Sequence, residues 1–198
     1  MVVLVTGSSG SGKSAFAEEY LMRLSTQAET KYYIATMQPF GEESLAKIRR
    51  HQRLRAGKGF TTIEQSRDLT KAAQRIAKRS NEFQEEAVTV NRPENSVPFI
   101  RDTALLECMS NLVANEMFEE QGAHDRTVSE VTKGIENLLE QAAHVVIVTN
   151  EIFSDAVVFD GDMDSYLEYL GKINQAAAQR ADEVVEVIYG IPVLSLIH

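Results

Sequence analysis

The feature that most constrains the fold of this chain is a glycine-rich segment at residues 7–14, which reads Gly-Ser-Ser-Gly-Ser-Gly-Lys-Ser. The segment fits the spacing G-x-x-x-x-G-K-[ST]. A short apolar, β-branched run, Val2–Thr6, precedes it, and helical apolar spacing follows from Lys13 to about Leu24. A strand that enters such a turn and a helix that leaves it form the context in which this pattern wraps phosphate groups.

The loop predicts how a nucleoside triphosphate is held. Glycine lets the backbone curl tightly and present N–H groups to phosphate oxygens, and the helix adds the positive end of its dipole. We expect Lys13 to reach the β and γ phosphates and the Ser14 hydroxyl to hold Mg²⁺. A glycine-serine turn without a ligand is the alternative. The predicted nucleotide-binding residues here are Gly7, Ser8, Ser9, Gly10, Ser11, Gly12, Lys13 and Ser14.

Beyond the loop, apolar runs alternate with helical patterns. The alternation predicts an α/β fold, a P-loop NTPase-like three-layer sandwich with a mainly parallel sheet, in a single domain of residues 1–198. The polar stretch 80–100 contains two prolines and is interpreted as a long surface loop. Further strands are expected at 31–36, 60–63, 103–107, 144–149, 184–189 and 193–197, and further helices at 42–55, 68–79, 110–120, 128–143 and 164–181.

Composition narrows the class of protein. The chain is 43% hydrophobic and 25% charged, as in ordinary globular proteins, and no apolar run approaches the ~20 residues of a membrane span. The apolar run at the N-terminus indicates a strand rather than a signal peptide. One cysteine, Cys108, cannot form an internal disulfide, so a cytoplasmic location is expected. The net charge of −9 argues against a general nucleic-acid binder.

Acidic and amide residues follow two other predicted strands. P-loop enzymes place a carboxylate near the Mg²⁺ at the end of a second buried strand, and Glu107, at the end of the run 103–107, is the best candidate. An acid in this place is otherwise a strand end that meets water. Asn150 and Glu151 follow the run 144–149, and they either face the same site, beyond the carboxyl ends of the strands, or form a plain turn.

A local basic cluster stands out on this acidic chain. From Lys47 to Lys58 there are six basic residues and no acidic one, which suggests either a small anionic ligand or a solvated basic helix face. On a helix, Lys47, His51 and Arg55 share one face. Flanking cations disfavour the protonated imidazole, so His51 is expected to be neutral and nucleophilic near pH 7, unless it is an ordinary exposed histidine. No His/Cys cluster has metal-ligand spacing.

The order of these landmarks resembles a known family, the bifunctional adenosylcobinamide kinase / adenosylcobinamide-phosphate guanylyltransferases of cobalamin biosynthesis. The matching segments span nearly the whole chain. The phosphate loop is generic, whereas the other segments are specific in combination. They are residues 4–14 with Ala17 and Glu18, 33–36, 47–55 with 62–64, 105–108 with Asn115, and 148–151 followed by 171–175, 181–184 and Gly190.

The resemblance implies two reactions and their residues. A nucleoside triphosphate, GTP or ATP, first phosphorylates adenosylcobinamide, and GMP is then carried from GTP to the product on His51. Lys13 and Glu107 are implied to be catalytic, with Mg²⁺ held by Ser14 and Glu107, and the substrates are a nucleotide and a corrinoid. The family is a homotrimer, so we expect a homo-oligomer. The residues implied to bind nucleotide outside the loop are Lys47, Arg55 and Glu64.

The chain also departs from the family's pattern. Glycine stands at position 10 and phenylalanine at position 60, where the family usually has arginine and tryptophan, and the family's glycine and basic residues are missing within 152–170. Two rival functions therefore stay open. One is a diverged P-loop small-molecule kinase that forms no covalent nucleotide. The other is a GTP-sensing regulatory protein without turnover.

Overall fold

A single sheet of seven strands runs through the part of the chain that the computed structural model describes, residues 1–26, 29–89, 102–152 and 161–197. Its strands are β1 (Val2–Thr6), β2 (Lys31–Ala35), β3 (Phe60–Glu64), β4 (Thr103–Glu107), β5 (His144–Val148), β6 (Glu183–Ile188) and β7 (Ile191–Ile197). Their order across the sheet is β3-β2-β4-β5-β1-β6-β7. Strands β1 to β6 pair in parallel, and β7 returns antiparallel to β6.

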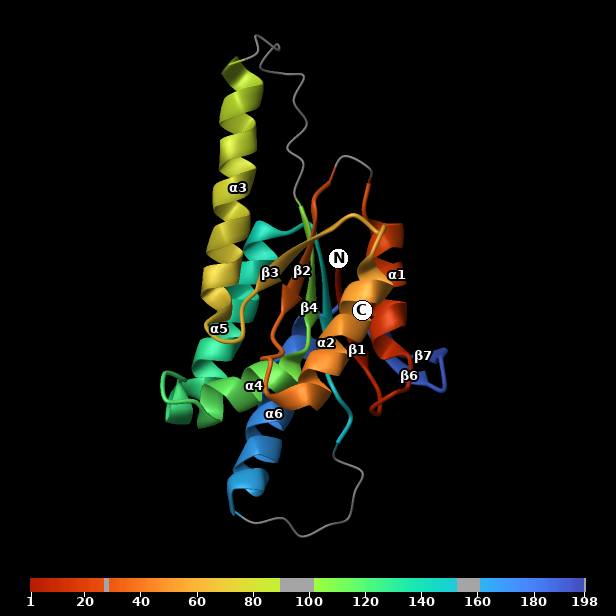
Figure 1. Cartoon of the computed structure of the whole chain (residues 1–198), viewed down its shortest axis with the longest axis vertical. Helices are drawn as coiled ribbons and strands as arrows, with labels where there is room; N and C mark the ends of the chain where they lie inside the picture. The colour runs from red at the N-terminus through yellow and green to blue at the C-terminus, as the bar shows by residue number, and fades with distance from the viewer. Residues whose placement is uncertain (27–28, 90–101, 153–160, 198) are drawn as a thin grey trace.

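Helices cover both faces of this sheet (Figure 1). They are α1 (Lys13–Leu24), α2 (Gly41–Arg55), α3 (Leu69–Thr89), α4 (Met109–Phe118), α5 (Thr127–Gln141) and α6 (Gly161–Arg180), with a 3₁₀ turn at His124–Arg126. Helices α1 and α2 lie over one face, and α3, α4, α5 and α6 pack on the other. The predicted three-layer α/β sandwich with a mainly parallel sheet is confirmed.

The continuous apolar runs have a simple cause in this arrangement. Side chains alternate across a strand, so a strand covered on both faces must be apolar at successive positions. In β2, Tyr32 and Ile34 enter the core beneath α3 and α5, whereas Tyr33 enters the core beneath α1. All three side chains are buried.

The interpretation of residues 80–100 as a loop is wrong for its first half. Helix α3 continues through this stretch to Thr89. No proline or glycine interrupts positions 69–89, and alanine, glutamate and glutamine there favour a helix. The hydroxyl of Ser80 donates to the backbone oxygen of Ile76 and to a carboxylate oxygen of Asp102, which holds this turn of the helix against the sheet. Residues 90–100 lie outside the described ranges.

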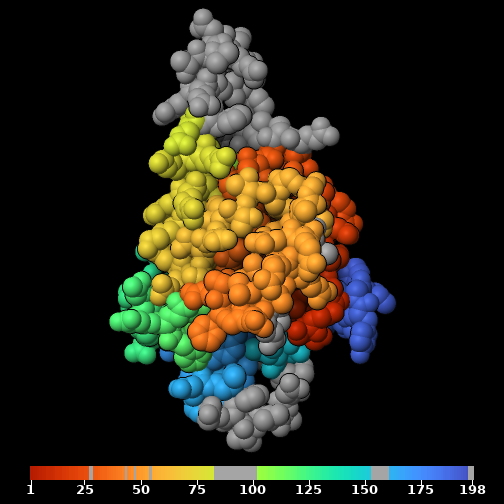
Figure 2. All heavy atoms as spheres, viewed as in Figure 1, coloured from red at the N-terminus to blue at the C-terminus, as the bar shows by residue number. Residues whose placement is uncertain are grey.

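The other predicted elements occur within a few residues of their predicted bounds. The atoms of helix α2 lie on the front of the molecule in the space-filling view (Figure 2). In the ranges that the structure describes, no helix combines the length and apolar character needed to cross a membrane.

Candidate active site

The phosphate loop leads from β1 into α1. Gly10 and Gly12 adopt φ values of 78° and 92°, in the left-handed region that glycine enters without strain. Gly12 directly precedes α1, and the first turn of that helix contains no acidic residue. The Nζ atom of Lys13 donates to the carbonyl oxygen of Ser8, 3.1 Å away, so the lysine lies across the loop. The backbone of the loop, the N-terminus of α1 and a lysine thus converge, as anion binding requires.

Neighbouring strands hold this loop in shape. The backbone N–H of Gly190, in the turn between β6 and β7, donates to the carbonyl oxygen of Ser11 at 2.7 Å. The N–H of Glu151, just beyond β5, donates to the carbonyl oxygen of Gly7 at 3.0 Å. A Cβ atom at Gly7 would lie only 2.5 Å from the carbonyl oxygen of Val187, so this position has no room for a side chain.

Ser14 and Glu107 meet at the mouth of the loop. The Ser14 hydroxyl donates to Oε1 of Glu107 over 2.9 Å. Burial raises the pKa of Glu107 to about 7, although the Ser14 hydrogen bond and the charge of Lys13 act in the opposite direction. The Oε2 atom of Glu107 is buried and has no hydrogen-bond partner among the described residues.

A divalent cation fits these two residues. A hydroxyl and a carboxylate with one unpartnered oxygen are the hard oxygen ligands that Mg²⁺ prefers, so Ser14 and Glu107 would be the residues that hold it. No group of three or more His, Cys, Asp or Glu residues in the described ranges forms a protein-only metal site. An Mg²⁺ site built by Ser14, Glu107 and a nucleotide needs no such group.

Two polar residues with no role assigned from the sequence position Glu107. The hydroxyl of Thr36 donates to the carbonyl oxygens of Glu107 and Cys108 and accepts from the Cys108 N–H. The side-chain amide of Asn115 donates to the carbonyl oxygens of Thr36 and Ser66, both at 2.9 Å. The ends of β2, β3 and β4 are thereby joined. Thr36 and Asn115 both lie in segments that match the family pattern, and this match is the sequence signal that could have indicated their role.

A cavity of about 370 Å³ lies between α2 and the carboxyl ends of β2, β3 and β4. Four residues singled out from the sequence line it: His51 and Arg55 from α2, Glu64 from β3 and Glu107 from β4. The tertiary structure therefore gathers them around one space. Other lining residues, to which the sequence analysis assigned no role, include Met37, Gln38, Leu45, Ile48, Gln52 and Asn111.

His51 is half-buried at this cavity, and its Nδ1 atom is buried without a hydrogen-bond partner in the described part of the chain. Burial lowers the pKa of His51 below its ordinary 6.5, and the charges of Arg55, Arg50 and Lys13 lower it further. The imidazole is therefore neutral at pH 7 and keeps a lone pair available for attack. The influence of Lys13 also places the ring within electrostatic reach of the phosphate loop.

The basic cluster divides into two groups. Arg49, Arg50 and Arg53 are exposed, as the solvated-face interpretation predicts. Arg55 instead turns inward, and its guanidinium carbon lies 3.6 Å from the centre of the Tyr33 ring. The cluster is thus partly a solvated surface and partly a wall of the cavity. The side chain of Lys47 lies outside what the structure describes.

The residues after β5 lie close to the same edge. Asn150 donates from its side-chain amide to the Ser110 hydroxyl at 2.7 Å. The backbone of Glu151 contacts the phosphate loop, as described above. This segment therefore borders the site, and the interactions shown for it support the loop and α4.

Fold and site together define a class. A mainly parallel sheet with a phosphate loop after β1, a lysine in that loop, and a serine bonded to a carboxylate at the end of another strand, β4, is the architecture of P-loop nucleotide-binding proteins. A solved ATPase domain is similar over 98% of this chain and 78% of its own length, with a TM-score of 0.50 and 10% sequence identity. At that identity, the likeness concerns the fold alone.

Sequence comparison narrows the class to one family. The family described as cobinamide kinase / cobinamide phosphate guanyltransferase matches residues 3–92 and 73–194, and the chain belongs to it. The chain is 29% identical to the bifunctional adenosylcobalamin biosynthesis protein CobU of Escherichia coli, over 98% of both proteins. It is equally similar to the protein of the same name from Salmonella typhimurium, with 29% identity and the same coverage.

Proposed function

We propose that this protein catalyses two successive transfers in cobalamin biosynthesis. It phosphorylates adenosylcobinamide with GTP or ATP, and it then transfers GMP from GTP to adenosylcobinamide phosphate through a guanylylated His51. The observation that carries the proposal is the shared cavity. His51, Arg55 and Glu107 line one space beside the phosphate loop, in a chain whose relatives are named for this pathway.

In the first transfer, the acceptor hydroxyl attacks the γ-phosphorus of the nucleotide. A new O–P bond forms as the bond between the γ-phosphorus and the β–γ bridging oxygen breaks, the hydroxyl proton passes to solvent, and the nucleoside diphosphate leaves. The loop amides and Lys13 hold the phosphates in position, and Ser14 and Glu107 hold Mg²⁺. The metal ion, when bound, neutralises charge on the phosphate oxygens.

In the second transfer, a neutral ring nitrogen of His51 attacks the α-phosphorus of GTP. An N–P bond forms, the α–β bridge breaks, and pyrophosphate leaves. A phosphate oxygen of the corrinoid then attacks the same phosphorus and breaks the N–P bond, which restores the histidine. Arg55 lies on the same face of α2 and supplies positive charge to the transferred group.

The test uses Mg²⁺ and GTP labelled on its α-phosphate. The protein is incubated, denatured and examined for covalent label. We expect an acid-labile label in the wild type and none in His51→Ala. The control is His124→Ala, because His124 is exposed and its ring nitrogens lie at hydrogen-bond distance from the carbonyl oxygens of Met117 and Glu120, away from the cavity residues. Intact GTP binding without any label would discard the guanylyltransferase step.

We also propose that the protein is a homo-oligomer, a trimer as in the family, assembled through β6 and β7. Strand β7 is an edge of the sheet, and such edges are ready to pair with another chain. The large apolar residues exposed on this hairpin are Ile188, Tyr189, Ile191, Val193 and Leu194. Their burial between copies would remove a substantial apolar patch from water.

Light scattering on wild type and Ile191→Glu tests the assembly. We expect a multiple of the 22.0 kDa chain mass for the wild type and a smaller particle for the variant. A wild type that runs as a single chain at all concentrations contradicts the proposal.

A further inference from the structure

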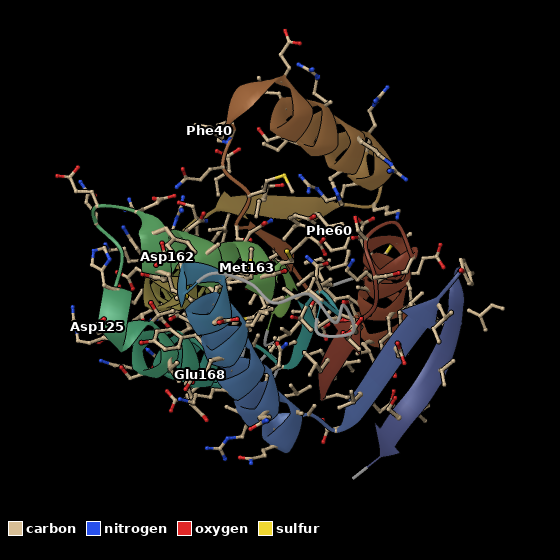
Figure 3. The ribbon with its side chains drawn as sticks, turned by 90° about the horizontal axis from the view of Figure 1, so that it is seen from below. Phe40, Phe60, Asp125, Asp162, Met163 and Glu168 are labelled. Atoms are coloured by element: carbon tan, nitrogen blue, oxygen red, sulfur yellow. The ribbon has the colours of Figure 1, made fainter. Side chains whose placement is uncertain are left out.

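Helix α2 carries His51 and Arg55, yet it has little packing of its own. No α2 side chain that the structure describes is buried. The face of α2 toward the sheet borders the cavity of about 370 Å³ rather than a packed core. In Figure 3, α2 is the outermost element on one side of the ribbon, with Phe40 at its N-terminal end. Since most helical stability in proteins comes from tertiary packing, the position of α2 depends on a few contacts near its ends.

Those contacts differ between the two ends. Before the helix, the Gln38 amide donates to the Ser66 hydroxyl at 3.1 Å, a neutral bond between neighbouring loops. After the helix, Nζ of Lys58 lies 2.6 Å from Oε2 of Glu18 in α1. Figure 1 shows this end of α2 beside α1. The one ion pair among the described contacts of this segment therefore joins it to the helix that leaves the phosphate loop.

The ion pair is asymmetric. The Glu18 side chain is 1% exposed, whereas that of Lys58 is 25% exposed. The second carboxylate oxygen of Glu18, Oε1, is buried and has no hydrogen-bond partner among the described residues. A buried carboxylate that loses its countercharge is strongly unfavourable, but a lysine at the surface can turn to water. The need to neutralise Glu18 thus keeps Lys58, and the end of α2, close to α1.

We propose that Glu18 and Lys58 are positioning residues for the transfer chemistry: their ion pair anchors the C-terminal end of α2 to α1 and so holds His51 at a fixed place beside the phosphate loop. Neither residue touches a reacting atom, and both act through His51. The catalytic consequence rests on the proposed function, whereas the anchoring does not.

The anchoring has a spectroscopic signature that general destabilisation lacks. Burial and nearby cations lower the pKa of His51. An α2 released from α1 moves its histidine toward water and away from α1, so the pKa of His51 rises toward its ordinary value. The charged groups that face this ring are Arg50 and Arg55 on its own helix, Lys13 on α1, and the cavity carboxylates Glu64 on β3 and Glu107 on β4.

The experiment is an NMR titration of the histidine rings in the nucleotide-free protein, with His51 assigned by its loss in His51→Gln. We expect the pKa of His51 to rise by about half a unit or more in Lys58→Met. The pKa should also rise in Glu18→Gln, because this variant lacks the same ion pair. The matched control is Lys172→Met, because Lys172 pairs with Glu168 on the exposed side of α6. This control should leave the value unchanged.

A second variant keeps the test decisive if Lys58→Met does not fold. The double variant Glu18→Gln with Lys58→Met buries no unpaired charge, so it is expected to fold while lacking the anchor. If Lys58→Met folds and the pKa of His51 is unchanged in it, the proposed anchoring is refuted. If Lys58→Met does not fold, an unchanged pKa of His51 in the double variant refutes it.

The labelled-GTP assay separates this inference from the proposed function. At saturating nucleotide, the rate of labelling should fall about tenfold in Lys58→Met, while KM changes less because the phosphate loop is untouched. If the wild type takes no label but the pKa of His51 still shifts, the proposed function fails and the anchor stands. Equal labelling rates with an unchanged pKa refute the anchor and leave the proposed function intact.

Discussion

The hydroxyl of Ser14 and the Oε1 atom of Glu107 are 2.9 Å apart and share a hydrogen bond, although 93 positions separate them in the chain. Ser14 stands in the first turn of α1, and Glu107 ends β4. Parallel pairing of β1 with β5 and of β5 with β4 brings both residues to the same edge of the sheet. A chain of ladder hydrogen bonds therefore builds the oxygen pair to which we assign Mg²⁺.

Replacement of Lys13 should abolish tight nucleotide binding. Lys13 is buried against the loop, and its ammonium is the cation nearest to the bound phosphates in the proposed site. We expect the Kd for GTP to rise at least about tenfold in Lys13→Ala, or ~1.4 kcal/mol, as measured by calorimetry. Lys78→Ala serves as control, because Lys78 is exposed on α3. Full activity of Lys13→Ala would refute the phosphate-loop assignment.

Glu107→Gln should separate stability from metal binding. Burial raises the pKa of this carboxyl from 4.5 to about 7, so the folded protein binds the extra proton and loses stability as pH rises through that window. A neutral amide removes the loss. At pH 8 and without ligand, we expect the free energy of unfolding of the variant to be higher by on the order of 1 kcal/mol. Calorimetric scans should show this as a higher unfolding temperature.

The same variant should bind nucleotide with a weaker dependence on Mg²⁺, because a carboxylate ligand is missing. Titration of GTP binding with and without EDTA measures this dependence. An unchanged response to Mg²⁺ would contradict the assignment of Glu107 as a metal ligand.

The rate of labelling by GTP should fall as the pH is lowered, since in the proposed mechanism only the neutral imidazole of His51 attacks phosphorus. The pKa of His51 is lowered from its ordinary 6.5, so the rate should be near its plateau at neutral pH and decline as the pH falls through the lowered pKa. The unfolded chain binds more protons between the two pKa values, so this residue also lowers stability as pH drops through that window.

Arg50→Gln provides the matched variant for this profile. Arg50 is exposed, and its charge lowers the pKa of His51. Its removal should shift the acid limb of the profile to higher pH with little change in the plateau. If the pH profile of the labelling rate is the same in Arg50→Gln, a group other than His51 causes the fall of the rate at low pH.

Gly7→Ala should destabilise the protein more than an ordinary glycine replacement in the left-handed region. Its Cβ would lie 2.5 Å from the Val187 carbonyl oxygen and 2.7 Å from Oγ of Ser11. We expect a loss of about 2–4 kcal/mol in denaturant unfolding. Gly57→Ala is the control, because Gly57 has a φ of 83° with no atom within 4 Å of an added Cβ. The free energy of unfolding should fall by about 1 kcal/mol in Gly57→Ala. Equal losses in the two variants would contradict the steric argument for Gly7.

Local patterns in the sequence were sufficient for the elements and for the phosphate loop. The loop motif consists of contiguous residues, and the apolar runs reflect strands that are buried on both faces. Both features can therefore be recognised from the sequence alone. The prediction ended the helix at residue 79, ten residues before the observed end of α3 at Thr89, because the prolines at positions 93 and 98 favoured a loop over the whole stretch 80–100. Helix propensity across 80–89 outweighed the polar composition there.

The sequence by itself determined the mainly parallel α/β class, the phosphate-loop motif and the helix that carries His51. Only the tertiary structure decided which distant residues meet: Glu107 with Ser14, Arg55 with Tyr33, and Lys58 with Glu18. The physical reason is that periodicity and motifs are set by neighbours in the chain. Contacts across strands are set instead by strand order and register, which no local pattern encodes.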